Sequence, residues 1–138
     1  MPYKSYDYYN HDAVMPGTTL TTAASGTSAA GTVVPVAAGA GTGSSTAIPT
    51  GATPNDARGQ FNLVTAGTPA AGKVASIFFT NPYSQTPGAV SVTCYDVTGT
   101  AAVALAANVV STSQIDFYTT GTALTTAHTY TINYHVIA

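Results

Sequence analysis

The stretch of sequence that decides the fold is QFNLVTAGTPAAGKVASIFFT, residues 60–80. Polar and apolar residues alternate in its first part, Gln60–Val64, and again in its last part, Lys73–Thr80. The alternation places five apolar side chains on the same side of these two segments: Phe61, Leu63, Ala75, Ile77 and Phe79. A period of two residues is typical of a half-buried β-strand, and Gly67 with its neighbours supplies a turn between the segments. The stretch therefore predicts two strands that share one core.

The rest of the chain toward the C-terminus repeats this pattern. Four further strands are predicted, at Ala89–Tyr95, Ala101–Val110, Gln114–Thr119 and Thr129–Ile137. The segment 101–110 contains enough alanine for a helix, but Val103, Leu105 and Val109 share one parity and no capping residue with an acidic first turn precedes it, so we interpret it as a strand. Six short strands separated by turns predict an all-β fold, namely an antiparallel β-sandwich or jelly-roll-like domain.

The chain before residue 58 has a different composition. Residues 16–57 are mostly Gly, Ala, Ser, Thr and Pro with scattered Val, and they include no aromatic residue. Alone, such a segment buries too little apolar surface to offset the entropy lost on ordering, yet it lacks the charge of soluble disordered chains. We therefore expect residues 1–57 to be an extended arm that becomes ordered on a neighbouring subunit, and residues 58–138 to be the sandwich domain. Within the arm only Thr32–Val36 is strand-like, and its proline confines it to a sheet edge or an extended conformation.

The beginning of this arm is rich in tyrosine. Four of the nine tyrosines lie within the first nine residues: Tyr3, Tyr6, Tyr8 and Tyr9. Tyrosine offers a large amphipathic contact area at a low entropic cost, so we interpret the four as an anchor that binds a partner. The alternative is a flexible leader that happens to contain four tyrosines. A core of about 80 residues built from small side chains should be marginal alone, which favours self-association.

The charge of the chain excludes several classes of function. Charged residues make up 6% of the 138 residues, against about 25% in ordinary globular chains, and the net charge is −2. No basic footprint for a nucleic acid is present. The N-terminus lacks the pattern of a secretory signal peptide and no run of eighteen apolar residues occurs, so we expect synthesis in a cytoplasm and no membrane partner. The one cysteine excludes an intrachain disulfide framework and a cysteine-built zinc site.

Few residues could perform acid–base or metal chemistry. His11 lies beside carboxylates and could suggest a metal site, but a solvated tail is the preferred interpretation. Asp96 and Asp116 could meet as a pair for acid–base catalysis, yet we expect both to be exposed on the sandwich surface. His128 is expected in the turn before the last strand, and His135 on its outward face. No catalytic residue, cofactor or metal ion is predicted, and we expect the protein not to be an enzyme.

Three other features have a structural interpretation. Cys94 follows the apolar parity of its strand and is expected to be a buried structural thiol. The glycines of Gly39–Gly43 resemble a phosphate-binding loop in composition only, since no Lys-Ser/Thr follows them, so we interpret them as part of a flexible arm. Arg58 could pair with Asp56 or with another subunit, but a solvated junction is slightly favoured.

Three segments together resemble a known kind of domain. They are ARGQFNLVTAGTPAAGKVASIFFT (57–80), the connection NPY with a later proline (81–87), and the closing AHTYTINYHVI (127–137). They resemble a small β-domain of tailed-bacteriophage virion proteins, found on capsid decoration proteins and at tail-fibre or head-fibre tips. The resemblance covers about 80 residues and implies a β-sandwich on the outside of a virion. The segment 93–99 departs from the pattern, so the specificity of the loops does not carry over.

The resemblance implies a capsid decoration or cement protein. Such a protein would bind the outer surface of the assembled capsid, with the major capsid protein as partner, the arm between coat subunits and the sandwich as a homotrimer. Binding to the lattice but not to free subunits would stabilise the shell. The alternative is a receptor-binding tip of a tail or head fibre that recognises the host surface. A glycan depolymerase is a weaker interpretation, because the carboxylates are too few.

Overall fold

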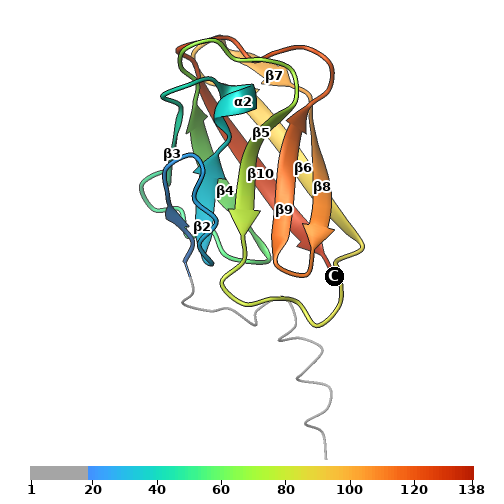
Figure 1. Ribbon diagram of the computed structural model, residues 1–138. Coiled ribbons are helices and arrows are strands. Elements are labelled where there is room, and N and C mark those ends of the chain that lie inside the picture. Colours follow the sequence, from blue (N-terminus) through green and yellow to red (C-terminus); the bar gives the residue numbers. More distant parts are fainter. Residues whose placement is uncertain (1–18) are drawn as a thin grey trace, which may run out of the picture.

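The computed structural model describes residues 19–138, which form two five-stranded sheets packed face to face (Figure 1). In spatial order, sheet I consists of β1 (Thr21–Thr22), β2 (Thr32–Pro35), β5 (Lys73–Phe78), β9 (Gln114–Thr119) and β8 (Leu105–Ser111). In the same way, sheet II consists of β3 (Ser45–Ala47), β4 (Arg58–Val64), β10 (Thr129–Ile137), β6 (Ala89–Asp96) and β7 (Ala101–Val103). One short helix, α2 (Ala37–Ala40), lies between β2 and β3. The predicted all-β sandwich is confirmed.

The order of the strands makes the sandwich jelly-roll-like. The first long strand, β4, pairs with the last strand, β10, in sheet II, while the second, β5, pairs with β9 in sheet I. The chain therefore passes from one sheet to the other and returns beside its own beginning, as Greek-key connections do. Every pairing is antiparallel except that of β1 with β2.

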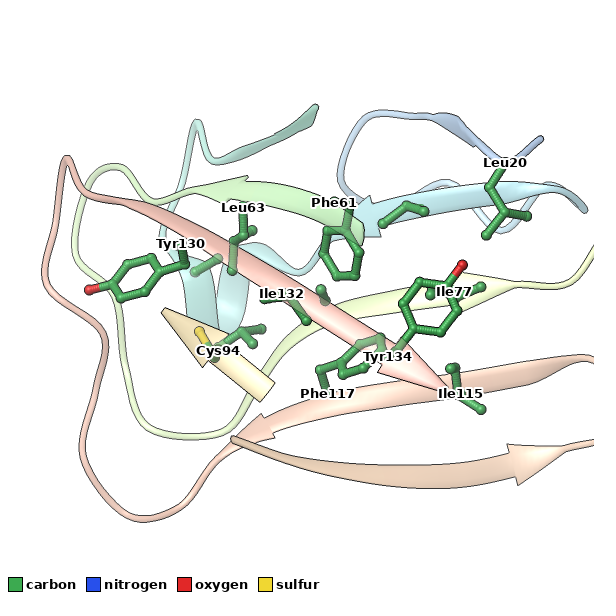
Figure 2. Close-up of a cluster of buried hydrophobic side chains, with 14 of the residues drawn as sticks. Leu20, Phe61, Leu63, Ile77, Cys94, Ile115, Phe117, Tyr130, Ile132 and Tyr134 are labelled. Carbon is green, nitrogen blue, oxygen red and sulfur yellow. The ribbon is translucent and has the colours of Figure 1, made fainter. Parts of the chain in front are cut away.

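The core lies between the sheets and consists of the inward-facing residues of both (Figure 2). The ring of Phe61 on β4 packs edge-on against Phe117 on β9 with 5.6 Å between centroids, and Tyr134 on β10 contacts both rings. Such aromatic pairs add to the stabilisation from burial. The predicted core faces of residues 61–63, 75–79, 115–117 and 130–136 are buried as expected.

The strand prediction is confirmed for five segments and refined for the sixth. The segment 101–110 is extended, not helical, but it divides at Ala104 into β7 in sheet II and β8 in sheet I. The chain changes sheet at this one residue. The alternation of the sequence continues across it and therefore does not reveal the change.

The prediction of an arm over residues 1–57 is wrong for residues 19–57. All four residues of β2 are buried, β2 pairs with β5, and β3 pairs with β4. Leu20 is also a core residue. The physical reason is that the few large apolar residues of this segment fill the core between the sheets, and its small residues allow the backbone to pack closely. The domain therefore includes the region before residue 58, and its proline-containing strand lies near a sheet edge, since β1 covers only Thr32 and Val33.

The glycine-rich segment is a tightly packed corner of the sandwich and not a flexible arm. Gly39 lies so close to Lys73 O that a Cβ atom on it would overlap this oxygen. A Cβ atom on Gly41 would likewise overlap Ala66 O. Gly41 also has a φ of +90°, which favours glycine. The glycines are needed here for close approach of backbone to backbone. Within residues 19–138, no helix has the length and apolarity to span a membrane.

Candidate functional site

The three aspartates of the described residues are buried, with exposed fractions of 1% for Asp56, 6% for Asp96 and 3% for Asp116. The expectation that Asp96 and Asp116 are exposed is wrong. A buried carboxylate must be paired or hydrogen-bonded, because desolvation of an isolated charge is costly. The partners of each aspartate therefore decide whether it is structural or free for chemistry.

Asp116 is held by side chains on the outer face of sheet I. Its Oδ1 accepts hydrogen bonds from Ser76 Oγ at 2.6 Å and Gln114 Nε2 at 2.9 Å, and its Oδ2 lies 3.2 Å from Lys73 Nζ. The cluster lies beside a groove of about 390 Å³ whose other wall is the segment 25–28. Because Lys73, Ser76 and Gln114 already bind Asp116, these three side chains stabilise the sheet face.

Asp96 forms a pair with His128 at the end of sheet II. His128 Nδ1 lies 2.7 Å from Asp96 Oδ2, and Gly99 N–H donates to Oδ1 at 2.8 Å. Burial raises the pKa of the Asp96 carboxyl, but the hydrogen bonds from Gly99 and His128 outweigh burial and hold that pKa below its usual 3.8. The carboxylate form thus fastens the turn after β6 to the start of β10.

An Asp–His pair resembles two members of a catalytic triad, which also requires an activated nucleophile and oxyanion donors. The nearby hydroxyl of Thr98 accepts the N–H of Thr129 at 3.0 Å. The nearby thiol, Cys94, is buried as expected, and burial, helped by the negative charge of Asp96, raises its pKa to about 12. A thiol with so high a pKa is a poor nucleophile. The geometry assigns this cluster to the closure of one end of the sandwich.

Asp56 fixes the connection between β5 and β6. Its two carboxylate oxygens accept the N–H groups of Thr80 at 2.7 Å and Asn81 at 2.9 Å, and its carbonyl accepts Tyr83 OH at 2.9 Å. The alternative of a local Asp56–Arg58 ion pair is wrong, because the carboxylate faces this connection. Arg58 is exposed, which agrees with the favoured interpretation.

The outer face of sheet II is the candidate interaction surface. Registers of β4, β10 and β6 align its outward side chains in three rows: Asn62, Thr131 and Tyr95; Gln60, Asn133 and Thr93; Arg58, His135 and Ser91. We call these nine residues the sheet II face. Gln60 Nε2 donates to Asn133 Oδ1 at 3.1 Å, and Tyr95 is 46% exposed. The face consists mainly of neutral hydrogen-bonding side chains.

One fixed charge lies on this face. Within residues 19–138, Arg58 is the one Lys, Arg or Asp whose side chain has neither a hydrogen bond nor an ion pair. Beside it, a shallow groove of about 480 Å³ is lined by Thr53, Asn55, Gly59, Gln60 and Asn133. A cation surrounded by amides and hydroxyls is suited to recognise a carboxylate or another anionic group.

The residues singled out in the sequence fall into three groups. The anchor tyrosines Tyr3, Tyr6, Tyr8 and Tyr9, together with His11, lie outside the described residues. His128 and the three aspartates are structural, and His135 is exposed on the sheet II face as its parity predicts. Within the part of the chain that is described, no group of three or more His, Cys, Asp or Glu residues is arranged to hold a metal ion. The sheet II face itself was missed, although the parity opposite to Phe61 gives its β4 residues.

Comparison of the chain with family models, with curated proteins and with solved structures found no match.

Proposed function

We propose that the protein is a virion structural protein that decorates the outer surface of an assembled phage capsid and stabilises it by binding. The observation that carries the proposal is the distribution of polar groups: the buried carboxylates are used by the fold, whereas the sheet II face presents nine aligned side chains, most of them polar, that are exposed or half-buried. Such a surface is suited to binding a partner. The resemblance of residues 57–80, 81–87 and 127–137 to virion β-domains supports the same class.

In this proposal the major capsid protein is the partner, and the Tyr-rich N-terminal segment adds an anchor. Protein interfaces include direct hydrogen bonds and bridging waters beside their apolar contacts, and the amides and hydroxyls of the sheet II face are able to form both. A protein that binds only the assembled lattice stabilises that lattice by mass action, and the gain grows with occupancy. The capsid exterior is the corresponding location.

The experiment that tests the proposal is a count of copies per purified virion, by quantitative mass spectrometry against the major capsid protein. Hundreds of copies support decoration of the capsid lattice. Complete absence from virions overturns the proposal.

A second experiment tests the sheet II face itself. Thr93→Arg places a large charged side chain at the middle of the face, whereas Thr122→Arg places the same side chain in the exposed loop between β9 and β10. We expect capsid occupancy to fall with Thr93→Arg and to stay unchanged with Thr122→Arg. Equal occupancy of the two variants would exclude this face from the contact.

One observation favours a second candidate, a receptor-binding tip that recognises an acidic saccharide of the host surface. Arg58, Gln60 and Asn133 meet at one groove, and Tyr95 lies on the same face. This arrangement could bind a carboxylate together with sugar hydroxyls. Binding to an array of acidic glycans that is lost in Arg58→Ala, together with a few copies per virion, would favour this candidate over decoration.

A further inference from the structure

The four edges of the two sheets are unequal. The edge strands β1, β3 and β7 contain two, three and three residues, whereas the fourth, β8, contains seven. Proteins commonly protect a sheet from pairing with another chain by shortening the edge strand, by placing charge or proline on it, or by covering it. Three edges of this sandwich are protected by shortness, and β8 is not.

The sequence of β8 provides no other protection. Leu105–Ser111 reads LAANVVS and contains neither a charged residue nor a proline. Every second side chain is exposed, and Val110 is 47% exposed. In Figure 1, β8 lies at the outer side of sheet I, with β9 as its one neighbour in that sheet.

Hydrogen bonds at the ends of β8 and β9 identify the backbone groups on the open edge. Thr119 N–H donates to Gly72 O on the β5 side, and the Thr120 hydroxyl donates to Ala104 O. Backbone groups alternate between the two sides of a strand. The groups of Ala106 and Asn108 therefore face β9, and those of Leu105, Ala107 and Val109 face outward. Within residues 19–138, β9 is the one strand paired with β8, and no turn or loop hydrogen bond reaches the backbone of these three residues.

We propose that the protein forms a twofold dimer in which β8 of one copy pairs antiparallel with β8 of a second copy, centred on Ala107. In this register the N–H and C=O groups of Ala107 form hydrogen bonds with the same groups of Ala107 in the second copy. The backbone groups of Leu105 pair in the same way with those of Val109 in the second copy. It uses the regular part of β8 and ends before the irregularity between Val109 and Ser111. The two copies of sheet I become one continuous ten-stranded sheet.

The strand is suited to a second copy of itself. The register places Ala106 opposite Asn108 on the outer face, so small and neutral side chains meet and no like charges oppose each other. On the inner face, half-buried Leu105 meets Val109 of the other copy, and Ala107 meets its own equivalent. These contacts extend the core across the junction. Because each copy uses the same edge, the assembly closes at two copies and does not grow into a fibre.

This dimer differs from the homotrimer expected from the decoration hypothesis. A ring of three copies would need β8 to pair with a different edge, and the other edges contain only two or three residues. Most of the outward groups of β8 would then stay unpaired. The proposed pairing of β8 does not depend on which partner the sheet II face binds.

The test is the association state of the full chain by sedimentation velocity over a range of concentrations. Two matched variants share Asn108→Lys, whose side chain lies across from Asp116 in the same copy. In Ala106→Lys/Asn108→Lys, lysines face each other across both equivalent pairs, and the dimer dissociation constant should rise about tenfold or more. In Ala106→Asp/Asn108→Lys, opposite charges meet, and the dimer should persist. Circular dichroism establishes that both variants are folded.

A disulfide trap tests the register independently. In the variant Ala106→Cys/Asn108→Cys, the thiol at position 106 of one copy lies opposite the thiol at position 108 of the other copy. The two residues form a pair without mutual backbone hydrogen bonds, in which the side chains are close enough for a disulfide. Oxidation should yield a covalent dimer on a non-reducing gel, whereas Ala106→Cys alone should not. The proposal is overturned by a monomeric or trimeric wild type, by a dimer indifferent to the two lysines, or by failure of the double-cysteine variant to cross-link.

Discussion

At the residue scale, Asp56 is the side chain whose removal should lower the stability of the fold most. It is fully buried and accepts two backbone N–H groups of the β5–β6 connection. Asp56→Ala leaves both donors without a partner, and we expect a loss of about 2–4 kcal/mol in the free energy of unfolding, measured with urea. Asp56→Asn keeps one acceptor and should lose less. Equal stability of the alanine variant and the wild type would contradict the assignment.

The pair of Asp96 and His128 gives stability a dependence on pH. Because the pKa of Asp96 is lower in the folded chain than its usual 3.8, the carboxylate stabilises the fold above the unfolded pKa, and this contribution disappears as pH falls through the folded pKa. We expect the wild type to exceed Asp96→Asn in stability at about pH 5 and to approach it toward about pH 2. A constant difference across this range would show that the carboxylate form is not the stabilising one.

The environments of these aspartates could not be predicted from the sequence. Asp116 follows the outward parity of its strand, so exposure was the reasonable expectation. Its burial depends on Ser76, which is 40 residues away in the chain, and on Lys73. Donors brought together by tertiary structure decide the state of a buried carboxylate, and alternation within one strand carries no information about them.

At the scale of elements, the corner around α2 should be sensitive to one added methyl group. Gly41 has a φ of +90°, and its Cβ would overlap Ala66 O. Gly51 has a similar φ of +82°, but no atom lies near the position of its Cβ. We expect Gly41→Ala to destabilise the protein by about 3–5 kcal/mol, from strain plus overlap, and Gly51→Ala by about 1–2 kcal/mol, from strain alone. Thermal unfolding of both variants measures the difference, and similar losses would show that the corner is loosely packed.

The strands that alternation predicted are those with one face on the core. β4, β6, β9 and β10 each carry apolar residues at every second position, and their registers follow from that face. β5 was predicted from the parity of Ala75 and Ile77, although its other face is buried as well. The segment of β2 was predicted to be strand-like but was assigned to the arm, because it contains Pro35 and stands among small residues. The elements from β1 to β3 are also short and rich in small residues, which resemble a linker in composition.

At the scale of the whole molecule, the boundary between arm and domain moves from residue 57 to before Leu20. Composition predicted this boundary from the absence of aromatic residues. However, a sandwich can be completed by Leu20, Val33 and Val34 once the larger side chains of the later strands have defined its core. The division into sheets depends on such long-range pairing, as between β2 and β5, and local composition is a poor guide to it.

Two truncations therefore have different expected outcomes. Removal of residues 1–57 deletes β2 and β3 and exposes the edges of β5 and β4, so we expect no cooperative thermal unfolding and loss of the β signal in circular dichroism. Removal of residues 1–18 retains every core residue of the described structure, and Tm should stay within about 5 °C of the wild type. The shorter truncation also removes Tyr3, Tyr6, Tyr8 and Tyr9 while it keeps the sheet II face. Under the decoration proposal its capsid occupancy should fall, and full occupancy would show that the tyrosines are not an anchor. A folded, cooperative product of the longer truncation would contradict the place of β2 and β3 in the sandwich.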